Sequence, residues 1–178
     1  QARPYGDLTL ELLAELAQRA RIERHPLLEK TENPQKIALI VVTSDKGLCG
    51  GFNANILRRM ESYLNENSDK DVQIIAVGKK VRDYARKHHL NMTAEYIELF
   101  NDMDFSITRK IILHVIELFS SKKVDKIEII YNEFKSVIQQ NLTVQQLLPI
   151  EPAENEGESE TGHLQKIAYI YEPSFEAL

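Results

Sequence analysis

Residues 43–53 read Thr-Ser-Asp-Lys-Gly-Leu-Cys-Gly-Gly-Phe-Asn, and this stretch decides how the fold is interpreted. It follows the apolar run 37–42 and precedes a segment of helical periodicity, so it occupies the turn of a βα unit, where nucleotide-binding folds carry their phosphate loops. The spacing fits neither phosphate motif. A dinucleotide loop needs Gly-x-Gly-x-x-Gly, but Cys49 stands third when counted from Gly47. A Walker loop needs Lys after its last glycine, where this chain has Phe52.

The glycines of this stretch, Gly47, Gly50 and Gly51, are predicted to form a structural turn. Their expected role is to let the chain reverse sharply and to bring the next helix close to the strand, and an anion site at the helix N-terminus is the alternative. If Gly50 or Gly51 has a positive φ, a β-branched side chain there would be strained. Cys49 is the single cysteine, which excludes an internal disulfide, and we expect it to act as a small turn residue without thiol chemistry.

The composition indicates one domain with a real core, because 43% of the 178 residues are hydrophobic. The net charge of −5 argues against binding to nucleic acid, which requires a basic face. No apolar stretch approaches the ~20 residues of a membrane span, and residues 1–7 lack the apolar segment of a signal peptide. His88 and His89 are adjacent, a spacing that does not suit a metal site on one helix face. We therefore expect a soluble protein of a reducing compartment that holds no metal and no cofactor.

Hydrophobic periodicity alternates between helix and strand along the chain. Helices are predicted over 8–24, 53–65, 79–88 and 105–120, and strands over 36–43, 72–77, 92–98, 127–134, 137–147 and 164–171. The strand over 36–43 is almost continuously apolar, as a strand covered on both faces should be. Within the helix over 53–65, the side chains expected to point inward are Ile56, Leu57, Met60 and Leu64.

Connection and handedness rules convert this order of elements into a fold class. We expect a three-layer, Rossmann-like α/β domain, with a mostly parallel sheet, an antiparallel edge formed by the two late strands, and one preceding helix. The five basic residues that follow Gly78 form the one cationic cluster, and an exposed, solvated helix face is favoured over contact with an acidic partner. That cluster consists of Lys79, Lys80, Arg82, Arg86 and Lys87.

The stretch 43–53 resembles the signature of the γ subunit of the F-type ATP synthase, its central rotor stalk. Further segments resemble the same family in the same order along nearly the whole chain: Ala2-Arg3-Pro4-Tyr5, His25-Pro26-Leu27-Leu28, Tyr131-Asn132-Glu133-Phe134, Leu147-Leu148-Pro149 and Tyr169-Ile170-Tyr171-Glu172-Pro173. Members of this family begin and end with long helices that form a coiled-coil shaft. No heptad pattern of several repeats occurs here, so we expect this chain to be the globular foot of the stalk without its shaft helices.

The resemblance implies a rotor subunit with no active site, which couples rotation of the membrane c-ring to ATP synthesis in the α/β hexamer. It implies that the ε subunit docks on the side of the domain and that loops of the c-ring lie beneath it. It also implies that the shaft helices, which are missing here, contact the α and β subunits. ATP chemistry would be confined to the β subunits. Membrane contact would come only through the c-ring, on the cytoplasmic side of an energy-transducing membrane, with a bacterial plasma membrane favoured.

The expected organisation is a single γ-subunit domain over 1–178. It comprises a remnant shaft helix over 1–27, an α/β core over 36–150, an acidic loop over 151–163, and a last strand and lead-in to the missing C-terminal helix over 164–178. The segment that matches the family's ring-facing part supplies the expected partner contacts, namely Tyr169, Ile170, Tyr171 and Glu172.

Two other classes of function remain open from the residues alone. A flavodoxin-like domain would bind a small ligand, or act on it, through the loop after the first strand. A stand-alone adaptor would share the fold but never meet an ATP synthase. Binding of nucleotides or flavins distinguishes the first alternative, and capture of the ε subunit distinguishes the second.

Overall fold

A computed structural model describes residues 12, 26–46, 51–98, 106–134 and 140–151. Its elements are the 3-10 helix η1 (Pro26–Leu28), strands β1 (Lys36–Val42), β2 (Asp71–Val77), β3 (Met92–Tyr96), β4 (Lys126–Phe134) and β5 (Gln140–Leu148), and helices α2 (Phe52–Glu66), α3 (Lys79–Lys87) and α4 (Ser106–Ser120). The predicted strand over 164–171 lies outside the described residues, as does the helix over 8–24 except for Leu12, which is helical.

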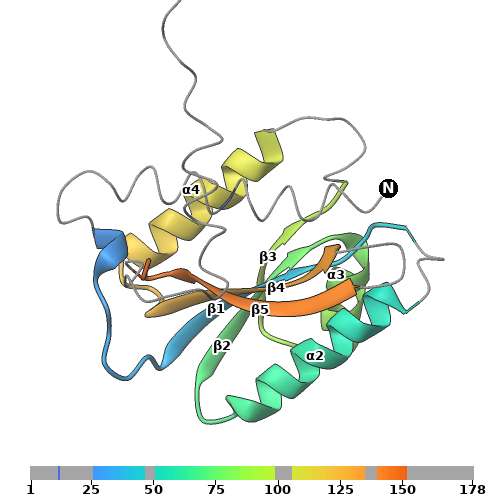
Figure 1. Cartoon of the computed structure of the whole chain (residues 1–178), viewed down its shortest axis with the longest axis horizontal. Helices are drawn as coiled ribbons and strands as arrows, with labels where there is room; N and C mark the ends of the chain where they lie inside the picture. Colours follow the sequence, from blue (N-terminus) through green and yellow to red (C-terminus); the bar gives the residue numbers. More distant parts are fainter. Residues whose placement is uncertain (1–11, 13–25, 47–50, 99–105, 135–139, 152–178) are drawn as a thin grey trace, which may run out of the picture.

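The five strands form one sheet in the order β3-β2-β1-β4-β5. β1 pairs in parallel with β2 and β4, and β2 pairs in parallel with β3. β5 returns antiparallel to β4 at one edge of the sheet (Figure 1). The predicted fold class is therefore confirmed, including the antiparallel edge made by the two late strands.

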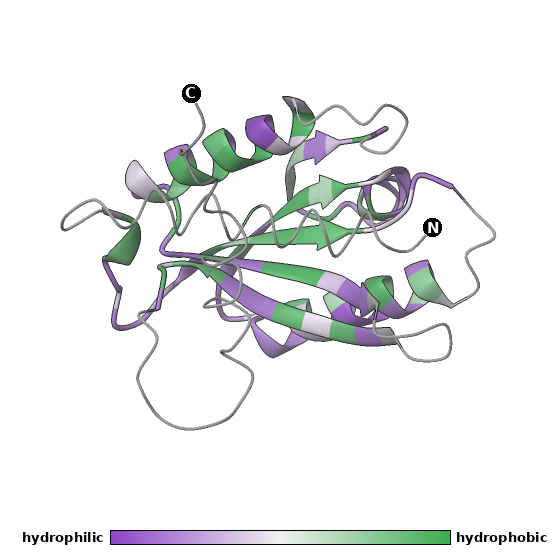
Figure 2. Ribbon diagram, turned by 45° about the horizontal axis from the view of Figure 1, so that its top comes forward, coloured by the Kyte–Doolittle hydropathy of each residue, from purple (hydrophilic) through white to green (hydrophobic). Residues whose placement is uncertain are grey.

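The sheet is the middle of three layers. α2 and α3 cover one face, and α4 with η1 covers the other (Figure 1). β1 lies between the two helical layers, which explains why its sequence is apolar throughout. Ile37, Leu39 and Val41 pack toward α2 and α3, while the alternate residues 38, 40 and 42 pack toward α4. Figure 2 shows the result, with hydrophobic residues concentrated along the central strands. Residues 37–42 are all at most 2% exposed, as expected for a strand buried on both faces.

α2 packs on the sheet through three fully or nearly fully buried residues at helical spacing, Ile56, Met60 and Tyr63. The prediction was correct for Ile56 and Met60, whereas Leu57 is only partly buried, as is Leu64. Tyr63 takes the inward position that Leu64 was expected to hold. Its hydroxyl donates a hydrogen bond to Glu128 on β4, whose carboxylate also lies 3.0 Å from the ammonium of Lys126. Burial, followed by this hydrogen bond, raises the pKa of Tyr63.

Two of the family-like segments meet at the end of the sheet where β5 finishes. Leu27 of η1 is fully buried and belongs to the core cluster beneath α4. Its carbonyl oxygen accepts a hydrogen bond of 2.9 Å from the amide of Ile150. The peptide bond between Leu148 and Pro149, just before this contact, is cis. The described helices are all too short or too polar to cross a lipid bilayer.

Candidate functional site at the carboxyl edge of the sheet

Residues 43–53 begin where β1 ends. Thr43, Ser44 and Asp45 follow Val42 directly, so they lie at the carboxyl edge of the sheet. The N-terminus of α3 lies at the same edge because β2 is parallel to β1. In open α/β sheets this edge is where ligands bind, so the partners of these polar side chains decide what the site can do.

Thr43 binds the start of α3 from another part of the chain. Its amide donates to the carbonyl oxygen of Val77 at 2.8 Å. Its side-chain Oγ1 accepts a hydrogen bond of 3.0 Å from the amide of Val81. The local N-cap residue, Gly78, makes no side-chain capping bond. From just beyond β1, Thr43 therefore supplies the side-chain oxygen that most helices obtain from their own N-cap.

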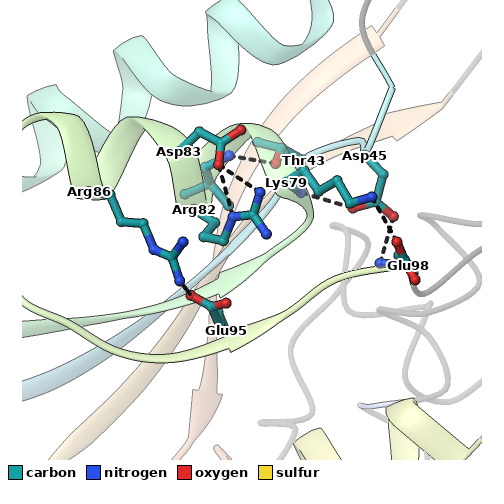
Figure 3. Close-up of polar contacts among 9 residues, drawn as sticks. Thr43, Asp45, Lys79, Arg82, Asp83, Arg86, Glu95 and Glu98 are labelled. Carbon is teal, nitrogen blue, oxygen red and sulfur yellow. Dashed lines mark hydrogen bonds and ion pairs between the residues drawn. The ribbon is translucent and has the colours of Figure 1, made fainter.

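Asp45 joins two further segments, as Figure 3 shows. One carboxylate oxygen, Oδ1, accepts a hydrogen bond of 2.9 Å from the amide of Lys79, and the other, Oδ2, accepts one of 2.9 Å from the amide of Glu98. The ammonium of Lys79 in turn donates to the carboxylate of Glu98 at 2.8 Å. This bond is the main cause that raises the pKa of Lys79 and lowers the pKa of Glu98.

Gly78 lies between β2 and α3 with a φ of 100°, in the region that favours glycine. A Cβ atom there would lie 2.0 Å from the carbonyl oxygen of Thr43, much closer than any real contact allows. The sequence predicted a strand over 72–77 and a helix over 79–88, with Gly78 between them, but it did not predict the positive φ of Gly78. An isolated glycine between a strand and a helix is the signal that could have identified it.

The last residue of the stretch, Asn53, binds the same loop from α2. Its Oδ1 accepts a hydrogen bond of 3.0 Å from the amide of Ser44, and its Nδ2 donates to the Ser44 hydroxyl at 2.8 Å. Gly51 is the N-cap of α2 with a φ of −77°, so the positive φ considered for it is not found. Gly47 and Gly50 lie outside the described residues, and the predicted role of the three glycines as a structural turn stays a prediction.

The amides at the start of α3 are thus occupied by the chain itself. Those of Lys79 and Val81 bond to Asp45 and Thr43, and that of Lys80 donates to the carbonyl oxygen of Ser44 at 3.4 Å. In a phosphate-binding fold, such amides point at the ligand. Among the described residues, no cluster of His, Cys, Asp or Glu has the arrangement of a metal site. The hydrogen bonds of Thr43 and Asp45 hold the ends of β1 and β3 to the start of α3, and we call this set of contacts the clasp. The geometry therefore supports a structural role for this edge instead of a phosphate site at α3.

The basic cluster of α3 is largely neutralised within the domain. Arg82 pairs with Asp83 at 2.7 Å and Arg86 pairs with Glu95 of β3 at 2.7 Å, in addition to the pair of Lys79 with Glu98 (Figure 3). The predicted exposed helix face holds in part, because Arg86 and Lys87 are exposed whereas Lys79, Lys80 and Arg82 are half-buried. Three of the five cationic side chains have acidic partners. Contact of the remaining charge with an acidic partner stays a hypothesis.

Tyr131, in the family-like segment of β4, gives a testable pH dependence. Burial, followed by the nearby Glu133 carboxylate, raises its pKa from 10.0 to about 12. A raised tyrosine pKa means that the folded state holds the proton more tightly. Its stabilising effect is complete below pH 10 and is lost as the pH rises toward 12. We expect Tyr131→Phe to flatten this part of the stability profile, measured by urea unfolding between pH 9 and about 12; an unchanged slope would contradict this assignment.

The fold and this edge together define the class of protein: a doubly wound α/β domain in which the chain's own side chains occupy the amides at the start of α3. A family model described as "ATP synthase" matches residues 1–178. The chain is 39% identical to the ATP synthase gamma chain of Chlorobaculum parvum, with 100% of this chain and 61% of the relative covered. It is 37% identical to that of Pelotomaculum thermopropionicum, with coverages of 99% and 60%. The chain belongs to the family of ATP synthase gamma chains.

Solved structures show the same fold. A chain in the central stalk and c-ring structure of Tetrahymena thermophila mitochondrial ATP synthase superposes with a TM-score of 0.55 at 23% identity, covering 90% of this chain and 71% of that one. A chain in the rotor structure of Euglena gracilis mitochondrial ATP synthase gives 0.52 at 21% identity, with coverages of 93% and 67%. The chain spans 61% and 60% of the length of the two curated relatives above.

Proposed function

We propose that this chain acts as the globular foot of a rotor stalk, which couples rotation of a c-ring to ATP synthesis in an α/β hexamer and has no active site of its own. The observation that carries the proposal is the match to ATP synthase gamma chains over 100% and 99% of this chain. Support comes from the carboxyl edge, where Thr43 and Asp45 occupy the amides of Val81 and Lys79, so that these two amides of the α3 N-terminus are not free to bind an anion.

The proposed partners are the ε subunit, the c-ring, and the α and β subunits of the same complex. The proposed location is peripheral, on the cytoplasmic side of an energy-transducing bacterial membrane, with the membrane reached only through the c-ring. The 27 acidic against 22 basic residues suit such a protein-binding role better than one on nucleic acid.

The proposed contact with the c-ring is the segment of Tyr169, Ile170, Tyr171 and Glu172. Aromatic side chains supply a large contact area at a low cost in conformational entropy, which suits a contact that must carry torque. A carboxylate would complement basic residues on the ring and set the register of the contact more than its affinity.

This contact is tested by cross-linking in a chimeric gamma chain, in which residues 1–178 replace the matching segment of the Chlorobaculum parvum relative. Cysteines placed at Tyr169 or Tyr171, in assembled membranes, are expected to cross-link to cysteines in the c-subunit loops. Cysteine at Asp69, which lies in the exposed turn between α2 and β2, is the control and is expected to form no such link. Cross-links to α or β alone would contradict the proposed orientation.

A further inference from the structure

The carboxylate of Asp45 is bonded to residues 34 and 53 positions further along the chain. Its two oxygens are divided between the amide that starts α3 and the amide of Glu98, just beyond β3. Hydrogen bonds from amides to an ionised carboxylate are roughly twice as strong as those between neutral groups, and they are directional. One side chain therefore holds the loop after β1, the start of α3 and the end of β3 in one arrangement.

The backbone conformation of Glu98 is unfavourable by itself and needs stabilising contacts. Its φ is 63°, in the left-handed region that few residues other than glycine adopt. Such a conformation persists only where the surroundings impose it. Here Asp45 fixes the Glu98 amide at 2.9 Å and Lys79 fixes its carboxylate at 2.8 Å. The predicted strand over 92–98 ends instead at Tyr96, two residues before this turn.

We propose that Asp45 is a positioning residue which holds residues 43–46 after β1, the start of α3 and residues 97–98 after β3 as one rigid unit, so that the foot transmits torque without deforming at this edge. The inference rests on the proposed function, because stiffness matters only in a part that transmits force. The strands that lead into these residues carry a buried hydrophobic core on both faces of the sheet. Loops are ordinarily the segments that open locally at the lowest free energy. A side chain that bonds two of them together raises the free energy of local opening at this edge.

Two substitutions separate this role from a general contribution to stability. Asp45→Ala removes both acceptor oxygens, whereas Asp45→Asn keeps the shape and one acceptor oxygen while its amide group opposes the second N–H. Asp69→Asn is the matched control because it makes the same change of charge in an exposed turn. Val81 serves as an internal reference, since its amide is held by Thr43 and not by Asp45.

Amide hydrogen exchange of the 178-residue chain provides the first test. In Asp45→Ala, the amides of Lys79 and Glu98 are expected to exchange at least roughly tenfold faster, as follows from losing a hydrogen bond to a charged group. In Asp45→Asn, one of the two is expected to do so. The Val81 amide should keep its protection, and Asp69→Asn should change none of the three. Equal acceleration of all amides, or of none, would overturn the clasp.

The second test uses the chimeric gamma chain in the assembled complex. ATP-driven proton pumping per ATP hydrolysed is expected to fall roughly twofold or more in Asp45→Ala, because the freed loops open locally under load, while Asp69→Asn pumps normally. Faster local exchange with undiminished pumping would overturn the role in torque transfer. Failure of the unsubstituted chimera to enter the complex would instead count against the proposed function, and the exchange result would still decide whether Asp45 is the clasp.

Discussion

Replacing Gly78 with alanine is expected to cost the domain about 3 kcal/mol of stability or more, enough to unfold a marginally stable chain. Two effects act together. The backbone φ of 100° strains any L side chain, and the added Cβ would lie 2.0 Å from the carbonyl oxygen of Thr43. That oxygen belongs to backbone packed at the sheet edge, so relief would require β1 and α3 to separate.

Gly51→Ala is the matched control for Gly78→Ala. Gly51 has a φ of −77°, and the nearest atom to an added Cβ is the flexible end of Asn55 at 3.4 Å. Thermal unfolding followed by circular dichroism should show a large loss of Tm for Gly78→Ala and a shift near zero for Gly51→Ala. Similar losses in both variants would show that the conformation at residue 78 is not what the fold depends on.

Leu27→Ala is expected to destabilise the domain by about 2–5 kcal/mol, the usual range for emptying a fully buried leucine site. Leu27 has no exposed surface and lies in the cluster that holds α4 on the sheet. Its neighbour Leu28 is half-buried, so Leu28→Ala should cost about 1 kcal/mol.

Urea unfolding of the two leucine variants provides the measurement. The midpoint for Leu27→Ala should fall well below that for Leu28→Ala at a similar slope. Equal midpoints would mean that η1 is not part of the core, and that the His25-Pro26-Leu27-Leu28 segment is matched in sequence without anchoring the sheet.

The parts of the fold that were predictable from the sequence depend on local pattern. β1 was identifiable because residues 37–42 are apolar throughout, and α2 because Ile56 and Met60 recur at helical spacing. The parallel sheet with an antiparallel edge then followed from connection rules that hold for nearly all such sheets.

The partners of polar side chains were not predictable, because each pairing joins residues far apart in the chain. Asp45 belongs to the stretch that was interpreted as the turn of a βα unit, yet the amides it binds lie 34 and 53 residues away. Tyr63 was not expected to point inward, because its buried hydroxyl depends on Glu128, 65 residues further on. Sequence pattern shows which face of an element is apolar, but it does not show which distant polar group will satisfy a buried one.

Coupling of rotation to catalysis carried out elsewhere is the proposed role of this chain, and ATP-driven proton uptake by an assembled enzyme tests that role. The chimeric gamma chain carrying residues 1–178 would be assembled with the other subunits of the Chlorobaculum parvum enzyme in membrane vesicles, and ATP-driven proton uptake would be recorded. We predict uptake that is sensitive to an uncoupler, together with no ATP hydrolysis by the 178-residue chain alone. Assembly that hydrolyses ATP without proton uptake, or hydrolysis by the isolated chain, would contradict the account.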